Sequence, residues 1–244
     1  MWTIARFAST SLFSLRPANV TTSGGKSLLT PTPFSIKMSL LDVAIRVYGV
    51  GQGRERFPQI RDFKVAVNLP QQIMVNNTFV KILRPHKQGV KDQLGTGLAG
   101  PMGSTIAYRE FIQFGGEVQI ALSSNTSEGT VLSLPQLLSQ VHYLGKRGGF
   151  MQFLGYEESE ELPEQFTVVT GGAMDTFELG GTLQLLDDCG PKMTFDHANV
   201  YTRKRLGINQ VAGRILRPVI LPYRMARSSR GYTLYERFDG AGSA

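Results

Sequence analysis

Cysteine and histidine are scarce in this chain, and their scarcity excludes several kinds of site. Cys189 is the single cysteine and has no partner for an internal disulfide. A chain this poor in cysteine fits a reducing compartment, and we expect a cytoplasmic protein. His86, His142 and His197 are scattered along the sequence and form no metal-ligand spacing with Cys189. We therefore predict that the protein binds neither a metal nor another cofactor.

Long apolar runs and catalytic motifs are missing as well. No apolar stretch approaches the roughly 20 residues of a membrane-spanning helix, so we expect no membrane partner. A GxSxG nucleophile motif is absent, and the glutamates between residues 157 and 161 are too dense for a tuned acid–base pair. Residues 95–100 have GxGxxG spacing, but Pro101 follows where a dinucleotide-binding loop would open a helix. These absences predict that the protein is not an enzyme and has no catalytic residue.

Basic residues are unevenly distributed, and their distribution favours an anionic partner. The chain carries 26 Lys and Arg against 19 Asp and Glu, a net charge of +7. Residues 190–240 hold ten of the basic and three of the acidic residues, which leaves sixteen of each elsewhere. Residues 155–189 hold nine acids and neither Lys nor Arg. Ordinary solvated faces also produce charge runs, but a split this large favours a dipolar protein with one face for a polyanion.

The first nineteen residues admit two interpretations. They carry Arg6, Arg16, several serines and no acid, a composition that organellar transit peptides share. They are also rich in β-favouring residues, which would place Trp2 and Ile4 on one face of a strand and Phe7 on the other. Arg6 interrupts the alternation, because it falls on the face of Trp2 and Ile4. We favour the strand.

Apolar spacing along the first 154 residues alternates between strand and helix periods. The expected elements are a strand at the N-terminus, a helix that Ser35 caps and Gly49 ends, a strand over 63–67, a strand over 106–122, a helix that Ser133 caps and Gly145 ends, and a strand over 150–154. This order is the βαββαβ plan of ferredoxin-like and RRM-like domains, an α+β class whose open sheet is a common RNA platform. The intervening residues 69–106 do not continue the pattern and are expected to form an inserted arm.

The pattern changes after the last of these strands. From about residue 162, short strand-like runs are separated by glycine pairs at 171–172 and 180–181. We predict two domains: an RRM-like RNA-binding domain over 1–160, with its arm at about 69–106, and a small β-rich, basic C-terminal domain over 161–244.

Two loops contain residue types that suit phosphate binding. Lys26 follows two glycines ahead of the first expected helix, where backbone amides and one ammonium group can hold a phosphate. Lys146 and Arg147 lie in a glycine-rich loop that lets the backbone approach a phosphate closely, and Phe150 at its end can stack on a base. Each loop is also compatible with an ordinary surface turn.

The arm mixes cations with an aromatic residue, as proteins that bind single strands do, although an exposed, soluble hairpin would have the same composition. Together with the two loops, the arm and the terminal basic block complete the set of predicted RNA-binding residues. The set comprises Lys26, Arg54, Arg84, Lys87, Lys91, Tyr108, Arg109, Lys146, Arg147, Phe150, Arg203, Lys204 and Arg205.

The two loops also resemble segments of a known family. Residues 21–37 read TTSGGKSLLTPTPFSIK and lead into the first expected helix, and residues 143–150 read YLGKRGGF. Both are similar to the CRISPR-associated Cas5 family. In that family a loop with Pro and Gly joins the first strand to the first helix, and a basic glycine loop joins a later helix to a strand. The inserted arm matches the family's thumb, so the resemblance extends over about residues 1–154.

The resemblance implies a specific function. Members of the family cap one end of type I Cascade complexes and hold the 5′ handle of the guide RNA (crRNA). The implied partners are crRNA, the Cascade backbone subunit, the Cascade large subunit, target DNA near its PAM-proximal end, and a nuclease or transposition adaptor. By the same resemblance, Lys26, Lys146 and Arg147 lie near handle phosphates, and the arm cations from residue 84 to 91 follow the guide.

Two other functions stay open. One branch of the family cleaves precursor crRNA without a metal by using Tyr, Lys and His, and this chain has Tyr48, Lys37 and His142. A metal-independent endoribonuclease of this kind requires that the three side chains converge. The second alternative is an organellar RNA-binding protein, which requires that the N-terminal segment is removed or unfolded.

Overall fold

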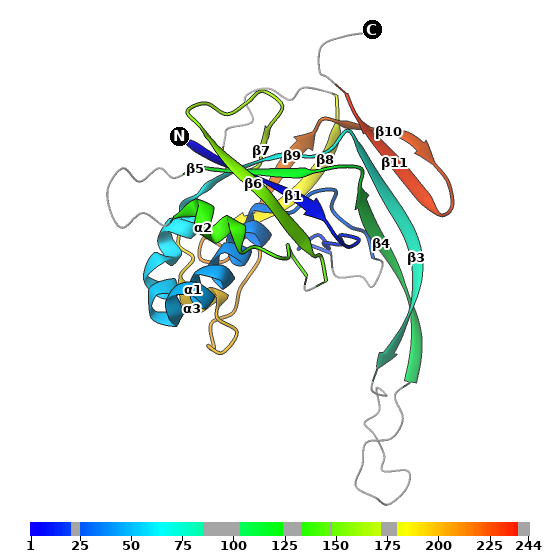
Figure 1. The fold of residues 1–244 in the computed structure, drawn as a ribbon. Coiled ribbons are helices and arrows are strands. Elements are labelled where there is room, and N and C mark those ends of the chain that lie inside the picture. Colours follow the sequence, from blue (N-terminus) through cyan, green and yellow to red (C-terminus); the bar gives the residue numbers. More distant parts are fainter. Residues whose placement is uncertain (21–24, 85–102, 124–132, 147, 172–179, 239–244) are drawn as a thin grey trace, which may run out of the picture.

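The computed structural model describes residues 1–20, 25–84, 103–123, 133–146, 148–171 and 180–238 of the 244-residue chain. In this part of the chain the helices are α1 (Pro33–Asp62), α2 (Leu134–Ser139) and α3 (Phe195–Ala198). The strands are β1 (Trp2–Ser9), β2 (Lys64–Asn68), β3 (Gln72–Arg84), β4 (Gly103–Phe114), β5 (Val118–Ser123), β6 (Met151–Ser159), β7 (Thr167–Val168), β8 (Thr182–Cys189), β9 (Arg214–Leu221), β10 (Tyr223–Ser228) and β11 (Tyr232–Arg237). The strands form three sheets in which all strand pairs are antiparallel (Figure 1). The expected α+β class is confirmed, with antiparallel sheets and few helices.

A five-stranded sheet forms the body of the protein, in the order β6-β1-β5-β2-β7. α1 lies between β1 and β2 in the chain, and α2 lies between β5 and β6. Val65 and Val67 of β2 point to the same side, and both join the main core with Ile36 and Leu40 of α1. The alternation of apolar residues along the strand thus places one face of the sheet against the helix.

β1 carries buried side chains on both faces, which explains the irregular alternation in its sequence. Ala5 and Phe7 belong to the main core, whereas Ile4 belongs to a second, smaller apolar cluster. Arg6 is exposed and forms an ion pair with Glu117 at 3.5 Å. The strand interpretation of this segment is confirmed. An organellar RNA-binding protein was expected to have this segment removed or unfolded. The segment instead contains a strand paired on both sides, which takes away the support for that interpretation.

α1 differs from its predicted form at its start and in its middle. Thr32 rather than Ser35 is the N-cap: its hydroxyl accepts a hydrogen bond from the Ser35 amide at 3.1 Å, and Pro33 occupies the first turn. Gly49 does not end the helix. Its φ of 83° kinks the chain, and helical structure then continues to Asp62. Glycine adopts this conformation at little cost, so the predicted turn after residue 49 is helical instead.

β3 and β4 form a long antiparallel ribbon that is inserted between β2 and β5. The strand predicted over 106–122 is therefore two strands, β4 and β5, and the arm extends past residue 106. Their cross-strand pairs run from Ile73 opposite Phe114 to Arg84 opposite Gly103. β11 pairs with β3 and β10 pairs with β11, so a four-stranded sheet has the order β10-β11-β3-β4. Side chains near the start of the ribbon are buried, and those further along it are exposed. The ribbon thus begins in the core and projects from the body as an arm (Figure 1).

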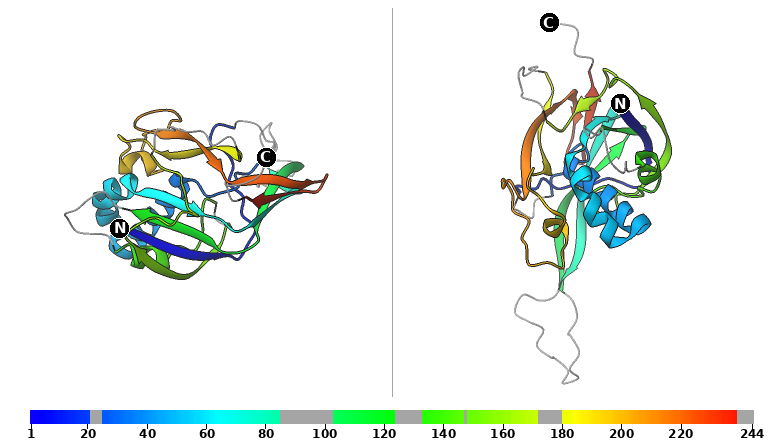
Figure 2. Two further views of the ribbon diagram at one scale, coloured as in Figure 1. Left: turned by 90° about the horizontal axis from the view of Figure 1, so that it is seen from above. Right: turned by 90° about the vertical axis from the view of Figure 1, so that its left-hand side faces the viewer.

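β8 and β9 form a two-stranded ribbon that packs on α1. Seen from above and from the side, it lies on the opposite side of the molecule from β1 and β6 (Figure 2). Leu186 and Leu221 of the ribbon belong to the same core as the five-stranded sheet. The predicted domain boundary at residue 160 follows the end of β6, and the division into two domains stays a prediction.

Length and hydropathy argue against membrane crossing by the described helices, since none of them combines the extent and the apolar composition that a span requires.

Candidate nucleic-acid interface

The loop that carries Lys26 is docked against the base of the arm. Gly25 forms a parallel bridge with Arg109 of β4, and the Glu110 amide donates a hydrogen bond to the Gly25 carbonyl at 2.7 Å. The Ser27 amide donates in turn to the Glu110 carboxylate at 2.8 Å. These bonds hold the backbone on both sides of Lys26, whose side chain is exposed. The loop therefore presents its ammonium group next to the strand that carries Arg109.

Replacing Gly25 by Ala is expected to displace this loop. A Cβ atom at this position would lie 2.3 Å from the Tyr108 carbonyl oxygen and 2.8 Å from the Arg109 Cα, and both are backbone atoms of a paired strand. We expect a loss of stability of about 1–3 kcal/mol, measured by urea denaturation. We also expect a larger loss of RNA affinity than Lys26→Ala causes. Gly51→Ala is the control, because no atom lies within 4 Å of its added methyl group. If Gly25→Ala has parent-like stability and RNA binding, the loop does not pack closely against the backbone of β4.

The second predicted loop, between α2 and β6, closes as a tight glycine turn. Gly145 and Gly148 have φ values of 72° and 116°, which favour glycine. The Gly149 amide donates to the Lys146 carbonyl at 3.0 Å. The Ser11 hydroxyl donates to the Gly148 carbonyl at 2.6 Å, which ties the turn to the segment that follows β1. The turn is thus held in place by its own backbone and by a neighbouring segment.

Three cations lie near one another where these loops approach β4: Arg16, Arg109 and Lys146, which we call the arm-base cluster. The pKa of Lys146 is lowered, first because neighbouring protein atoms desolvate the ammonium group and then because Arg109 and Arg16 add positive charge. The Nε of Arg16 is buried without a hydrogen-bond partner among the described residues. The acid nearest in sequence to Arg109, Glu110, already accepts from the Ser27 amide. A bound phosphate group would supply negative charge to these three cations, none of which forms an ion pair with an acid among the described residues.

Arg16 is the one member of this cluster that is absent from the set of predicted RNA-binding residues. Arg16 contributed only to the composition of the first nineteen residues and was not a predicted binding residue. The sequence feature that could have indicated a binding role for Arg16 is its position in the loop between the first strand and Lys26. The proximity to Lys146 joins residues 130 positions apart and follows only from the fold.

Aromatic and aliphatic side chains extend from this cluster along the arm. Phe150 is 50% exposed at the start of β6, and Tyr108 packs against Phe79 with ring centroids 5.4 Å apart. Phe79, Leu83 and Ile106 are 70%, 61% and 72% exposed. The strand register places these three and Tyr108 on one face of the ribbon. We call these four side chains the arm apolar face.

The other predicted cations that the structure describes lie apart from the arm-base cluster. Arg54 of α1 forms an ion pair with Asp196 at 2.7 Å, and its guanidinium lies 4.7 Å from the ring centroid of Phe195. Lys204 lies 3.9 Å from Asp196, and residues 203–205 are exposed. α3 lies beside α1, away from the β3–β4 ribbon (Figure 1). The predicted set therefore divides into two groups rather than one.

Three of the predicted residues, Lys87, Lys91 and Arg147, lie outside the described residues. Arg84 is the last residue of β3, opposite Gly103.

The residues that a ribonuclease would need have separate partners. Lys37 is buried and donates to Asp188 at 2.6 Å. The Tyr48 hydroxyl donates to the side-chain oxygen of Gln136 at 2.8 Å, and His142 is exposed near the end of α2. No hydrogen bond between described residues joins two of the three. Among the same residues, no group of three His, Cys, Asp or Glu side chains is placed to hold a metal ion.

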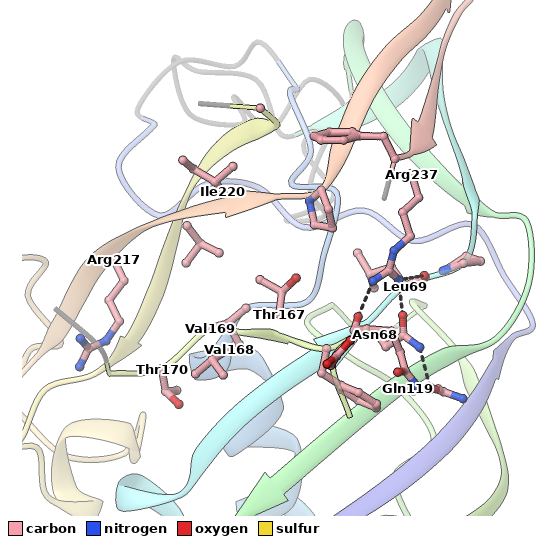
Figure 3. A pocket seen from close by; sticks show the side chains of 18 of the residues that line it. Asn68, Leu69, Gln119, Thr167, Val168, Val169, Thr170, Arg217, Ile220 and Arg237 are labelled. Carbon is pink, nitrogen blue, oxygen red and sulfur yellow. Dashed lines mark hydrogen bonds between the residues drawn. The ribbon is translucent and has the colours of Figure 1, made fainter. Parts of the chain in front are cut away.

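A cleft of about 1190 Å³ opens between β7 and β9 (Figure 3). Arg237 lies near one end, where its guanidinium donates to the Asn68 side chain, to the Leu69 carbonyl at 3.3 Å and to the Gln165 carbonyl. Arg217 lies near the other end and pairs with a buried acid at 3.2 Å. Both arginines are thus engaged in the fold. None of the predicted RNA-binding residues lines the cleft, so it is a different place from the predicted site.

A basic cluster formed by two docked loops and the base of an arm is suited to binding a polyanion on an α+β scaffold. Over 155 residues, or 63% of this chain, the sequence is 26% identical to the CRISPR-associated protein Cas5 of Archaeoglobus fulgidus. The match spans 63% of that protein, less than two thirds of its length. It confirms the resemblance to the Cas5 family: the chain is similar to a CRISPR-associated protein Cas5 over the matched residues.

Two solved structures of CRISPR proteins also align with this chain. A crystal structure of a CRISPR protein from Archaeoglobus fulgidus matches with a TM-score of 0.46 and 12% identity, over 98% of this chain and 92% of that chain. A chain of a CRISPR RNA-guided surveillance complex matches with a TM-score of 0.43 and 12% identity, over 91% of each chain. No model of a known protein family matches the chain.

Proposed function

We propose that this protein is a non-catalytic RNA-binding subunit of a type I CRISPR Cascade effector. It caps the 5′ handle of the crRNA and contributes to guide-directed binding of target DNA. The observation that carries this proposal is the arm-base cluster, which gathers three cations from three separate segments and pairs none of them with an acid among the described residues. The match to a Cas5 protein over 155 residues supports the same assignment.

Phosphate is the ligand that this cluster fits best. Lys26 lies on a loop that is hydrogen-bonded to the same strand as Arg109, so its ammonium group adds to the positive charge at the arm base. Phe150 is half exposed at the end of the glycine turn and offers a face for a base. Phosphates at the cluster and bases on aromatic side chains are the usual division of contacts for a single strand.

The proposal includes a ferredoxin-like fold for the first domain. A ferredoxin-like domain is supported by the strand order β6-β1-β5-β2, in which the last strand of the βαββαβ unit lies beside the first and the third lies between the first and second. The β3–β4 ribbon then corresponds to the thumb. The C-terminal domain over 161–244 would comprise β7 to β11, of which β7 and β11 complete the sheets of the first domain.

The arm apolar face is the contact that we propose for the neighbouring backbone subunit. Its four members share one face of the ribbon and three of them are largely exposed, and apolar surface of this kind marks protein–protein contacts. The large subunit, target DNA near its PAM-proximal end, and a nuclease or transposition adaptor are further proposed partners.

RNA binding by the isolated full-length protein tests the proposal. A labelled RNA that carries the 5′ repeat-derived segment of the native host's crRNA is titrated beside a length-matched scrambled RNA. We expect tighter binding of the repeat-derived RNA, and a logarithm of the association constant that falls linearly with the logarithm of salt concentration. Equal affinity for both RNAs at every salt concentration would contradict handle recognition.

The endoribonuclease alternative has its own test, in which a repeat hairpin RNA is incubated with the protein in EDTA. We expect intact RNA, because Lys37 is buried against Asp188 and does not reach a substrate. Specific cleavage that Tyr48→Phe or His142→Ala abolishes would establish the alternative and overturn the non-catalytic assignment.

A further inference from the structure

The turn that follows α3 holds two large side chains in solvent. Val200 is 85% exposed and Tyr201 is 95% exposed. A single apolar residue on a surface needs no explanation. Two adjacent apolar side chains at the tip of a turn are less usual. If hydrogen bonds fix the backbone of the turn, these side chains cannot fold back onto the protein and stay exposed to water.

The backbone beneath these side chains is braced by side-chain hydrogen bonds. The Tyr201 amide donates to the Asn199 side-chain oxygen at 3.0 Å. The Thr202 amide donates to the Asn199 carbonyl at 3.1 Å, and its hydroxyl reaches the Asp196 carbonyl at 2.5 Å. The turn is therefore closed on itself and tied back to α3, so that the tip projects as a fixed protrusion.

α3 is anchored in turn to the body of the protein. Phe195 packs edge-on against Phe57 of α1, with ring centroids 6.3 Å apart. Arg54 of α1 lies over the Phe195 ring and forms the 2.7 Å ion pair with Asp196. The protrusion is thus mounted on α1 by an aromatic contact and a salt bridge.

The segment after the tip is strongly basic. Arg203, Lys204 and Arg205 are all exposed. Lys204 shares Asp196 with Arg54, at the longer distance of 3.9 Å. Among the described residues, Arg203 and Arg205 have no acidic partner within ion-pair distance. An exposed aromatic ring followed directly by three cations suits a strand of bases and phosphates.

We propose that residues 200–205 form a second nucleic-acid contact, separate from the arm-base cluster. Tyr201 stacks on an unpaired nucleobase, Val200 packs against the edge of the same stack, and Arg203, Lys204 and Arg205 bind the phosphates on either side. Every base has a π-face, so this contact accepts any sequence. Tyr and Arg also occur in protein interfaces. A protein partner fits less well here because it would have to supply acids to three adjacent exposed cations, whereas a nucleic acid carries one phosphate for every nucleotide.

Single-stranded RNA and single-stranded DNA share this chemistry, and a fluorescent reporter distinguishes them. Tyr201→Trp places an exposed indole at the tip, and the emission of Trp2, the one tryptophan of the parent, is subtracted. The full-length protein is titrated with RNA and DNA oligonucleotides of about 15 nucleotides that are unrelated to any CRISPR repeat. Quenching by RNA alone assigns a guide strand, quenching by DNA alone assigns a target strand, and quenching by both assigns a general single-strand contact. No quenching by either overturns the proposal.

Affinity gives an independent readout. Tyr201→Ala is expected to weaken binding of the same oligonucleotides at least about fivefold, whereas Tyr201→Phe keeps the ring and the affinity. Tyr156→Ala is the matched control, since Tyr156 is 52% exposed on the acidic strand β6. Thermal unfolding should be unchanged, because Tyr201 contributes almost no buried area. Parent-like binding by Tyr201→Ala overturns the proposal.

The test separates this contact from the proposed function. Both experiments are repeated with Arg109→Ala and Lys146→Ala in the same chain, which removes two cations of the arm-base cluster. Quenching at position 201 should persist in that background. If quenching is lost in the variant without these two cations, residues 200–205 do not form a contact separate from the arm-base cluster. Persistence would leave the contact valid even if the handle assignment fails.

Discussion

Replacing Asp188 by Ala is expected to reduce the free energy of unfolding by about 3–5 kcal/mol. Asp188 is 3% exposed and accepts from Lys37 at 2.6 Å, from Arg217 at 3.2 Å and from the Cys189 amide at 2.7 Å. Lys37 is 2% exposed and has no other hydrogen-bond acceptor among the described residues. Removing the carboxylate would therefore leave an ammonium group buried without a counter-charge, which urea denaturation measures.

Two controls separate the buried charge from simple loss of a side chain. Asp187→Ala removes the neighbouring carboxylate, but its partner Arg214 has a side chain that is 28% exposed and can turn to water. We expect a loss of roughly 1 kcal/mol there. Replacing both Lys37 by Met and Asp188 by Leu should recover most of the stability, because the buried ammonium and carboxylate groups are then both absent. A smaller loss for Asp188→Ala than for Asp187→Ala would contradict this account.

Replacing Arg109 and Lys146 together by Ala is expected to abolish most of the affinity for crRNA. Hydrogen bonds to charged groups contribute about 1.5–3 kcal/mol each, so each side chain should account for roughly tenfold or more. The slope of log affinity against log salt should become shallower by about 0.7 for each phosphate that the protein no longer neutralises. Fluorescence anisotropy at several salt concentrations measures both quantities.

Stability distinguishes a binding role from a structural one for these cations. Partial desolvation of the ammonium group and two nearby cations lower the pKa of Lys146. The folded protein therefore holds that proton less tightly than the unfolded chain, and the charged side chain opposes folding at pH values below its lowered pKa. That cost disappears as the pH rises from the lowered pKa toward the ordinary value for lysine. Lys146→Ala should thus keep or raise stability while it weakens RNA binding.

A matched pair from the acidic strand completes the design. Glu157 and Glu158 are exposed on β6, and replacing both by Ala changes two charges without touching the arm-base cluster. We expect RNA affinity to stay the same or to rise slightly. If this pair and the Arg109/Lys146 pair weaken binding alike, the RNA-binding face has been assigned to the wrong surface.

Local chemistry made several elements predictable from the sequence. Ser133 caps α2 as expected, because its hydroxyl accepts from the Gln136 amide at 3.4 Å. The predicted end at Gly145 is wrong, because α2 ends at Ser139. Leu137 and Leu138 are buried, as helical spacing indicated. The predicted end of α1 at Gly49 is wrong. A left-handed glycine usually ends a helix, but here Gly49 only kinks the chain and further helical turns follow it.

The candidate site depends on contacts that the sequence does not encode locally. The glycine loops were recognisable, but the position of Gly25 against Arg109 joins segments 84 residues apart. Lys37 was a candidate for catalysis by residue type alone, and only the fold shows it buried against β8. Arg54 and residues 203–205 were grouped with the other cations because composition does not reveal that they lie beside α1 and α3.

Binding of the crRNA 5′ handle is tested by purifying the protein from its native host and sequencing the RNA that is bound to it. We expect a uniform short RNA whose 5′ end derives from a CRISPR repeat, and its recovery should fall in the Arg109→Ala, Lys146→Ala variant. Heterogeneous RNA, or no RNA above the background of an unrelated basic protein, would contradict the assignment as a handle-binding Cascade subunit.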